Sequence, residues 1–258
     1  MMCTLLFLIA LQPGERIGII SAMDIELVLI KQDMQVEATD TIASRVFDIG
    51  TINEIPCVCV KAGVSKVNAA VTALQLIREY EVGAIIFTGV AGGIDPLLDI
   101  GDVVISGKVV HHDYGQIVPD AFIAWDTIGF TADSTLITIA SQAAGQVEFE
   151  EVPKKICKET GHFPHVIVGT IATGDQFISS EEKRKWIETT FHAACVEMEG
   201  AAVAQVCVLN DIPFVIIRSL SDLANEKADI DFELFAEYAA HTSNLIVQEM
   251  LKIMGSSH

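Results

Sequence analysis

Residues 194–225, ACVEMEGAAVAQVCVLNDIPFVIIRSLSDLAN, contain the pattern that decides the fold. Ala, Val and Leu recur at helical spacing after the first acidic residues, and a turn with one proline follows. The run FVIIRSL then has the composition of a strand that is buried on both faces. A helix that leads through a short turn into a buried strand is the repeating unit of an α/β protein.

Three acidic residues of this stretch, Glu197, Glu199 and Asp222, lie among small and apolar neighbours rather than in a solvated run of charges. Because burying an unpaired carboxylate is costly, such residues need partners. Helix capping is the simpler alternative, with Asp222 capping the next helix and Glu199 in a first helical turn. The grouping of the three favours a binding site, whereas Glu197 alone fits a structural role.

Strand and helix alternate along the rest of the chain. Strands are expected at 16–21, 55–60, 84–89, 99–106 and 165–170, and helices at 23–34, within 62–80, at 131–145, after Ser179 and at 228–254. Residues 89–93 (GVAGG) are expected to form a glycine-rich loop, and residues 111–130 to be irregular. No repeat and no Pro/Gly-rich joint interrupts this order, so the sequence predicts one α/β domain over residues 16–254.

The overall charge limits the partners. The chain of 258 residues carries a formal net charge of -19, and 51% of its residues are hydrophobic. Nucleic-acid phosphates require clustered Lys and Arg, so nucleic acid is excluded as a partner, and anionic membranes are disfavoured in the same way. A small or neutral ligand fits better. The high hydrophobic fraction suits buried central strands and also an oligomer interface.

The cysteines and the two ends of the chain bear on location. Six cysteines are scattered without a metal-binding grouping, which is typical of reduced thiols in a cytoplasmic protein. Residues 1–15 form an apolar extension, and residues 1–11 are apolar enough for the core of an export signal, so an exported protein is the alternative. Residues 255–258 are set aside as an added tail.

Polar residues follow three of the predicted strands, in GIISAMDIE, FTGVAGG and IRSLSDLAN. Ligands of open α/β sheets bind outside the carboxyl ends of the strands. Glu26, Glu199 and Asp222 gathered there would make an acidic pocket that can bind a polyol and protonate a leaving base. For Glu26 the alternative is an acid in a first helical turn. The glycine-rich loop could bring backbone amides to a ligand, but it lacks both the GxGxxG spacing and a Walker lysine.

Residues 111–130 contain His, Tyr, Phe and Trp, which favours the rim of an active site or a contact with a partner. His111, His112 and Asp113 raise the alternative of a metal site. Adjacent histidines point in different directions and no third ligand has a helical spacing, so no metal is predicted.

Together these motifs resemble the 5′-methylthioadenosine/S-adenosylhomocysteine nucleosidases of the purine nucleoside phosphorylase-like superfamily. The resemblance covers nearly the whole chain after Arg16. It depends on GIISAMDIE, FTGVAGG with IGDVVIS, TGDQFI, VEMEGAAVAQVC and RSLSDLA, in the family's order and spacing. It implies a three-layer α/β/α fold with a twisted mixed central sheet, usually a homodimer, and hydrolysis of the N-glycosidic bond of an adenine nucleoside without metal or cofactor.

The resemblance also implies roles for individual residues. Asp222 would be the general acid that protonates adenine, and Glu26 would activate the attacking water. Glu199 would hold the ribose hydroxyls. Further contacts with the substrate or the polar network are implied for Met198, Phe177, Ile178, Arg218 and Phe232, and Phe122 and Ile123 are the candidates for residues that reach a neighbouring subunit's pocket.

One position departs from the family pattern. Many relatives carry Ser or Thr where this chain has Val90, at the start of the loop that continues with Ala91 and Gly92. Valine cannot supply a hydroxyl near the acid or the ligand, and Ser221 beside Asp222 is expected to compensate.

Three other functions are weighed against the nucleosidase. A nucleoside phosphorylase needs cationic or amide-rich loops for phosphate, whereas Asp24 and Glu26 at the first strand end repel it. An aminofutalosine-type nucleosidase would use the same grips for adenine and ribose. A non-catalytic nucleoside-binding surface protein would not need three carboxylates.

Overall fold

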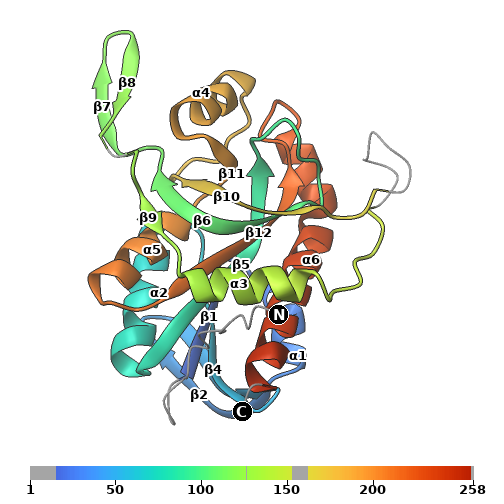
Figure 1. Ribbon diagram of the computed structural model, residues 1–258. Coiled ribbons are helices and arrows are strands. Elements are labelled where there is room, and N and C mark those ends of the chain that lie inside the picture. Colours follow the sequence, from blue (N-terminus) through green and yellow to red (C-terminus); the bar gives the residue numbers. More distant parts are fainter. Residues whose placement is uncertain (1–15, 126, 153–161, 257–258) are drawn as a thin grey trace, which may run out of the picture.

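The structure, a computed structural model, describes residues 16–125, 127–152 and 162–256 (Figure 1). The predictions for residues 1–15 and for the end of the tail, residues 257–258, lie outside the described residues. The C-terminal helix continues beyond the expected end at residue 254, and Gly255 is its last residue.

A ten-stranded mixed sheet lies at the centre of the molecule, with the order β11-β10-β6-β12-β5-β1-β4-β3-β2 and β9 paired to β6. Its strands are β1 (Arg16–Ser21), β2 (Gln35–Ile42), β3 (Arg45–Ile52), β4 (Ile55–Lys61), β5 (Val82–Gly93), β6 (Val103–His111), β9 (Phe130–Thr131), β10 (Val166–Thr173), β11 (Ala193–Glu197) and β12 (Phe214–Asp222). Because β11 also pairs with the end of β5, the strands from β5 to β11 curl into a closed ring. This ring surrounds the ends of the strands that carry the predicted site.

Helices cover both faces of the sheet, so the predicted three-layer α/β/α fold is confirmed. They are η1 (Asp24–Glu26), α1 (Val28–Gln32), α2 (Lys66–Glu79), α3 (Ser134–Ala144), α4 (Glu181–Phe191), α5 (Gly200–Leu209) and α6 (Ala228–Gly255). Helices α2 and α5 pack together on one face over a core that includes Phe87 and Ile216. Helices α3 and α6 pack together on the other face over Ile86 and Ile217. Alternating residues of β5 and β12 therefore feed the two cores, as the period of two requires.

Several predicted elements were wrong in detail. The expected loop 89–93 is the end of β5, because its backbone pairs with both β12 and β11. The expected irregular segment 111–130 contains a hairpin, β7 (Gly115–Val118) and β8 (Ala121–Ala124), which stands clear of the body in Figure 1. The expected helix 23–34 is divided into η1 and α1.

None of the helices in the described part of the chain combines the length and the apolar character that crossing a bilayer requires.

Candidate active site

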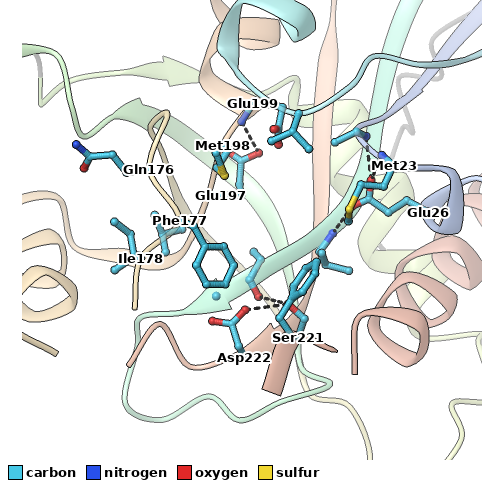
Figure 2. A pocket seen from close by; sticks show the side chains of 17 residues that line it. Met23, Glu26, Gln176, Phe177, Ile178, Glu197, Met198, Glu199, Ser221 and Asp222 are labelled. Carbon is cyan, nitrogen blue, oxygen red and sulfur yellow. Dashed lines mark hydrogen bonds between the residues drawn. The ribbon is translucent and has the colours of Figure 1, made fainter. Parts of the chain in front are cut away.

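One cavity of about 300 Å³ opens where β1, β5, β10, β11 and β12 end. Figure 2 shows its side chains, with Glu26, Glu199 and Asp222 coming from different sides of the cavity. The lining residues are Ala22, Met23, Glu26, Val64, Val90, Ala91, Gly92, Gln176, Phe177, Ile178, Val196, Glu197, Met198, Glu199, Ser221, Asp222 and Phe232. Eleven of the fourteen residues predicted from the sequence are therefore brought together here.

Glu26 is held by three backbone amides. Its Oε2 accepts hydrogen bonds from the N–H groups of Ala22 (2.9 Å) and Met23 (2.7 Å), and its Oε1 accepts one from Val90 N–H (3.0 Å). Burial raises the pKa of this carboxyl group, while the charge of Arg218 and the three amides oppose that rise. The side chain is thus fixed in one position, and Oε1 keeps a lone pair for a ligand.

Glu197, whose sequence context suggested a structural role, binds the start of α5 from the end of β11. The N–H of Gly200 donates to both of its carboxylate oxygens, at 2.9 and 2.8 Å. The Arg218 guanidinium donates to Oε2 at 2.6 Å, and both side chains are buried. A buried ion pair with further hydrogen bonds of this kind fixes geometry rather than adding much net stability.

Arg218 itself does not line the cavity. It lies behind the cavity wall, where its guanidinium stacks 4.1 Å from the Phe87 ring centre and faces Glu197. Its Nε is buried without a partner among the described residues. Its influence on Glu26 is therefore through charge.

Glu199 occupies the N-cap position just before α5, but its side chain forms no capping hydrogen bond, so side-chain capping does not account for this residue. Its Oε1 instead accepts a hydrogen bond from Ser65 N–H at 2.8 Å, across 134 positions of sequence. Burial, followed by the nearby charge of Glu197, raises the pKa of Glu199 to about 8. Within the described residues no hydrogen bond is formed to Oε2, so this oxygen is available to a ligand.

Asp222 ends β12 and does not cap α6, so the capping alternative is wrong here as well. Its Oδ1 accepts from Ala224 N–H (2.8 Å), and its Oδ2 lies 3.0 Å from the Ser221 hydroxyl. Burial raises the pKa of Asp222 to about 6. A carboxyl group with such a pKa can exist as the neutral acid near neutral pH.

An apolar side of the cavity faces Asp222. Phe177 and Phe232 meet edge to face with ring centres 5.9 Å apart, and Ile178 is buried beside them. Phe177 keeps 45% of its surface exposed, so its ring is available for stacking on a flat ligand. Met23 and Gln176, which the sequence did not single out, belong to the motifs GIISAMDIE and TGDQFI and also line the cavity.

Phe122 and Ile123 do not line the cavity of their own chain. Both lie in β8 of the hairpin, where Phe122 packs edge to face on Trp186 at 5.5 Å and Ile123 is 50% exposed.

Two glycines of β5 make room for the carboxylates. A Cβ atom on Gly89 would stand 2.5 Å from Oε1 of Glu26, and one on Gly92 would stand 2.7 Å from Oδ1 of Asp222. Both distances are far below van der Waals contact. The sequence suggested that these glycines admit a ligand to the backbone, and in the structure they admit the acidic side chains.

No group of three His, Cys, Asp or Glu side chains that could hold a metal ion occurs among residues 16–125, 127–152 and 162–256. His112 is fully buried and packs against Gly174, and burial lowers its pKa to about 4. His111 bonds to Gln205 at 3.2 Å.

The cavity can thus perform acid–base chemistry. It combines a carboxylate fixed by amides, a carboxyl group that can be protonated near neutral pH, and a third carboxyl group with one free oxygen. An aromatic wall beside the protonatable group would receive a planar, uncharged ring system.

Comparison with known proteins adds independent findings. Residues 16–252 match the family model described as phosphorylase superfamily. The 5′-methylthioadenosine/S-adenosylhomocysteine nucleosidase of Geobacillus thermodenitrificans is 37% identical over 249 residues, which are 93% of this chain and 97% of that protein.

Solved structures agree with this match. The 5′-methylthioadenosine/S-adenosylhomocysteine nucleosidase of Neisseria meningitidis, in complex with methylthio-immucillin-A, superposes with a TM-score of 0.80 and 35% identity, covering 93% of this chain and 99% of that one. The futalosine hydrolase of Helicobacter pylori gives a TM-score of 0.79 with 28% identity and the same coverages.

The pKa of Asp222 generates a prediction about stability. Because this pKa is raised from 3.8 to about 6 in the folded protein, the stability that the protonated group contributes is complete below pH 3.8 and is lost as the pH rises through 6. Asp222→Asn removes this loss. Relative to the parent, the variant should gain roughly 3 kcal/mol in free energy of unfolding between pH 4 and pH 8. Urea unfolding across that range measures the difference, and a difference independent of pH would contradict the assignment.

Proposed function

The chain belongs to the phosphorylase superfamily and, within it, to the 5′-methylthioadenosine/S-adenosylhomocysteine nucleosidases, and from this membership we propose that it hydrolyses the N-glycosidic bond of these two nucleosides. The products are adenine and the corresponding thioribose. The observation that carries the proposal is the pair of buried carboxyl groups with different environments, Glu26 and Asp222, on different sides of one cavity.

Asp222 is proposed as the general acid. Breaking the bond between adenine and the sugar leaves negative charge on the departing base, and a proton from Asp222 neutralises it. The pKa of about 6 leaves part of the population protonated at neutral pH, and the hydrogen bond from Ala224 N–H fixes Oδ1. Phe177 would stack on the base that receives the proton, and the main chain of Ile178 would read its edge.

Glu26 is proposed as the base that activates water. Positive charge develops on the sugar as the bond breaks, and a carboxylate nearby stabilises that charge. Oε1 accepts only one amide hydrogen bond and can therefore take a proton from a water molecule directed at the anomeric carbon. The raised pKa makes this carboxylate a stronger base than an exposed glutamate.

The remaining residues would position the substrate. The free Oε2 of Glu199 would accept hydrogen bonds from the ribose hydroxyls, with Met198 beside it. Phe232, at the start of α6, would cover the 5′ substituent, and Arg218 would act on Glu26 through its charge. Ser221 would supply the hydroxyl partner of Asp222 that Val90 cannot, because its Oγ lies 3.0 Å from Oδ2. Acid, base and water suffice for this chemistry, and we propose no cofactor.

Hydrolysis is favoured over phosphorolysis by the occupation of the backbone amides. A phosphate that attacked from the side of Glu26 would need the N–H groups of Ala22, Met23 and Val90, and the glutamate already accepts all three. The buried cation nearest to this position, Arg218, is paired with Glu197. Phosphate would therefore meet a carboxylate instead of a cradle of donors.

We also propose a homodimer in which the hairpin enters the partner's site. Helix α2 has an exposed apolar stripe, Val67, Val71 and Leu74, and Leu209 of α5, the helix that packs against α2, is exposed as well. Val64, just before α2, lines the cavity, so the stripe begins at the mouth of the site. A second copy on this face would bury the stripe and bring Phe122 and Ile123 of its hairpin to that mouth.

The four described cysteines are buried and free, which suits a cytoplasmic location.

The reaction is tested by turnover of methylthioadenosine, S-adenosylhomocysteine, 5′-deoxyadenosine, aminofutalosine and inosine, each with and without phosphate. We expect adenine and free methylthioribose from methylthioadenosine at the same rate in both conditions. Asp222→Asn and Glu26→Gln should each lower kcat at least about 100-fold while methylthioadenosine still binds. A requirement for phosphate, with a sugar 1-phosphate as product, would overturn the proposal.

The glycines of β5 give a second test. Gly89→Ala should displace Glu26, and Gly92→Ala should displace Asp222, because the new Cβ atom overlaps each carboxylate. Displacement by about 1 Å costs on the order of 100-fold in rate, so kcat should fall to that extent in both variants while the melting temperature changes little. Gly107→Ala in β6 is the control, since its Cβ would meet a valine methyl at 3.1 Å and the Gly169 carbonyl oxygen at 3.7 Å, and no residue of the cavity. Normal kcat in Gly92→Ala would argue against Asp222 as the acid.

The dimer is tested with Val71→Glu, which places a charge in the apolar stripe. Sedimentation should show a dimer for the parent and a monomer for the variant, with kcat/KM reduced at least about tenfold. Ile123→Ala should keep the dimer and raise KM. Leu97→Glu, at an exposed position outside the stripe, is the control and should remain dimeric. A monomeric parent with full activity would refute the proposal.

A further inference from the structure

The start of α2 is held by three acidic side chains from distant parts of the sequence. Ser65 N–H donates to Glu199 at 2.8 Å, and Lys66 N–H donates to Oδ1 of Asp175 at 2.8 Å. The Lys66 ammonium donates to Oδ1 of Asp113 at 2.6 Å. Two consecutive residues therefore connect the mouth of the cavity to three separate loops.

Asp113 closes this network into a ring. Its second oxygen, Oδ2, accepts a hydrogen bond from Asp175 N–H at 2.9 Å. Asp113 therefore binds both Lys66 and Asp175, the two residues that are already joined by the hydrogen bond from Lys66 N–H. The Lys66 and Asp113 side chains are 23% and 15% exposed. Burial would raise the pKa of Asp113, but the Lys66 ammonium and the Asp175 amide outweigh it and hold this pKa below its usual value. Asp113 is thus a partly buried, charged residue, and each of its two carboxylate oxygens accepts a hydrogen bond.

Ser65 has a backbone conformation that is normally reserved for glycine. Its φ is 101° and its ψ is 154°, a region in which a side chain clashes with the backbone. Such a conformation persists only where the surroundings determine it strongly. At this turn, Ser65 N–H donates to Glu199, Lys66 N–H donates to Asp175, and the Lys66–Asp113 ion pair follows directly. The carbonyl oxygens of Val64 and Ser65 also accept hydrogen bonds, from the Asn68 side chain and from Ala69 N–H. Without them, Ser65 would relax and its N–H would turn away from Glu199.

We propose that the Lys66–Asp113 ion pair is a positioning device for Glu199: it holds the strained turn at Ser65 so that the Ser65 amide fixes the carboxylate that binds the ribose hydroxyls. The inference rests on the proposed function, since that function assigns the ribose to Glu199. Neither Lys66 nor Asp113 lines the cavity, so both act through Ser65. The proposal also gives a role to Asp113 of the HHD motif.

Lys66→Met tests the device most directly, because it removes the ammonium group and leaves the bond between Asp113 and Asp175. We expect KM for methylthioadenosine to rise about tenfold, the loss of one charge-assisted hydrogen bond, with kcat changed less than about twofold. Asp113→Asn should behave alike, and the double variant should show no further loss. Lys66→Arg, which keeps the charge, should restore most of the affinity.

A substrate analogue separates positioning from general damage. With 5′-methylthio-2′,3′-dideoxyadenosine, which lacks both ribose hydroxyls, Lys66→Met should change KM less than about twofold, because Glu199 has nothing to hold. A second double-mutant cycle tests the strain at Ser65. In a Ser65→Gly background, the rise in KM for methylthioadenosine caused by Lys66→Met should be smaller, since glycine keeps φ near 101° without cost.

The control is Asp48→Asn. The Lys31–Asp48 pair has a similar distance, 2.7 Å, and its aspartate side chain is 14% exposed, but it lies on α1 and β3 away from the cavity. This variant should leave KM unchanged. Thermal unfolding of all variants checks that each remains folded.

The outcomes separate this inference from the proposed function. If the parent hydrolyses methylthioadenosine and Lys66→Met has a normal KM, or loses equally with the dideoxy analogue, the positioning role is wrong and the function stands. If the parent binds methylthioadenosine without hydrolysing it, the function is wrong, and the same comparisons made on Kd by calorimetry decide the positioning role. A parent that neither binds nor hydrolyses it overturns both.

Discussion

The interior of the cavity depends on burying carboxyl groups without leaving any of them bare. Glu26, Glu197, Glu199 and Asp222 are each less than a tenth exposed, and each is stabilised in a different way. Backbone amides hold Glu26, an arginine and a helix terminus hold Glu197, one amide holds Glu199, and an amide together with the Ser221 hydroxyl holds Asp222. Burial raises the pKa of Glu26, Glu199 and Asp222, and the neighbours of each carboxyl group oppose or add to that rise to a different extent. In the proposed reaction, these neighbouring carboxyl groups would serve as the acid, the base and the ribose-binding group.

The curvature of the sheet makes this arrangement possible. The end of β5 pairs with β12 on one side and β11 on the other, which closes a ring of strands around the cavity. The ring brings the acids of β11 and β12 within reach of the first strand, where Glu26 follows β1. An open sheet with the same strands would spread these residues along one edge. Closure of the ring therefore positions the residues of the cavity as well as joining the strands of the sheet.

Much of this could be predicted from sequence, because the main signals are local. The apolar runs identified β1, β4 and β12, and the polar residues after them indicated that Glu26, Glu199 and Asp222 would meet. The pairing of Gly92 and Gly93 with β11 could not be predicted, since it joins segments about a hundred residues apart and glycine is uncommon in strands. The partner of Glu199, the Ser65 amide, was equally hidden, because a backbone N–H has no signature in sequence. Strand β2 has no signal in the sequence, because it is an exposed edge strand without an apolar run.

Gly89 and Gly92 limit which amino-acid replacements the site can tolerate during evolution. Every other amino acid carries a Cβ atom, so no exchange at either position avoids contact with the adjacent carboxylate. The acids themselves have near-isosteric replacements in Asn and Gln, which keep the shape and change the chemistry. A descendant of this chain can therefore lose catalysis and retain the architecture by changing an acid. Changing one of these glycines leaves every acid in the sequence but moves the adjacent carboxylate out of its place.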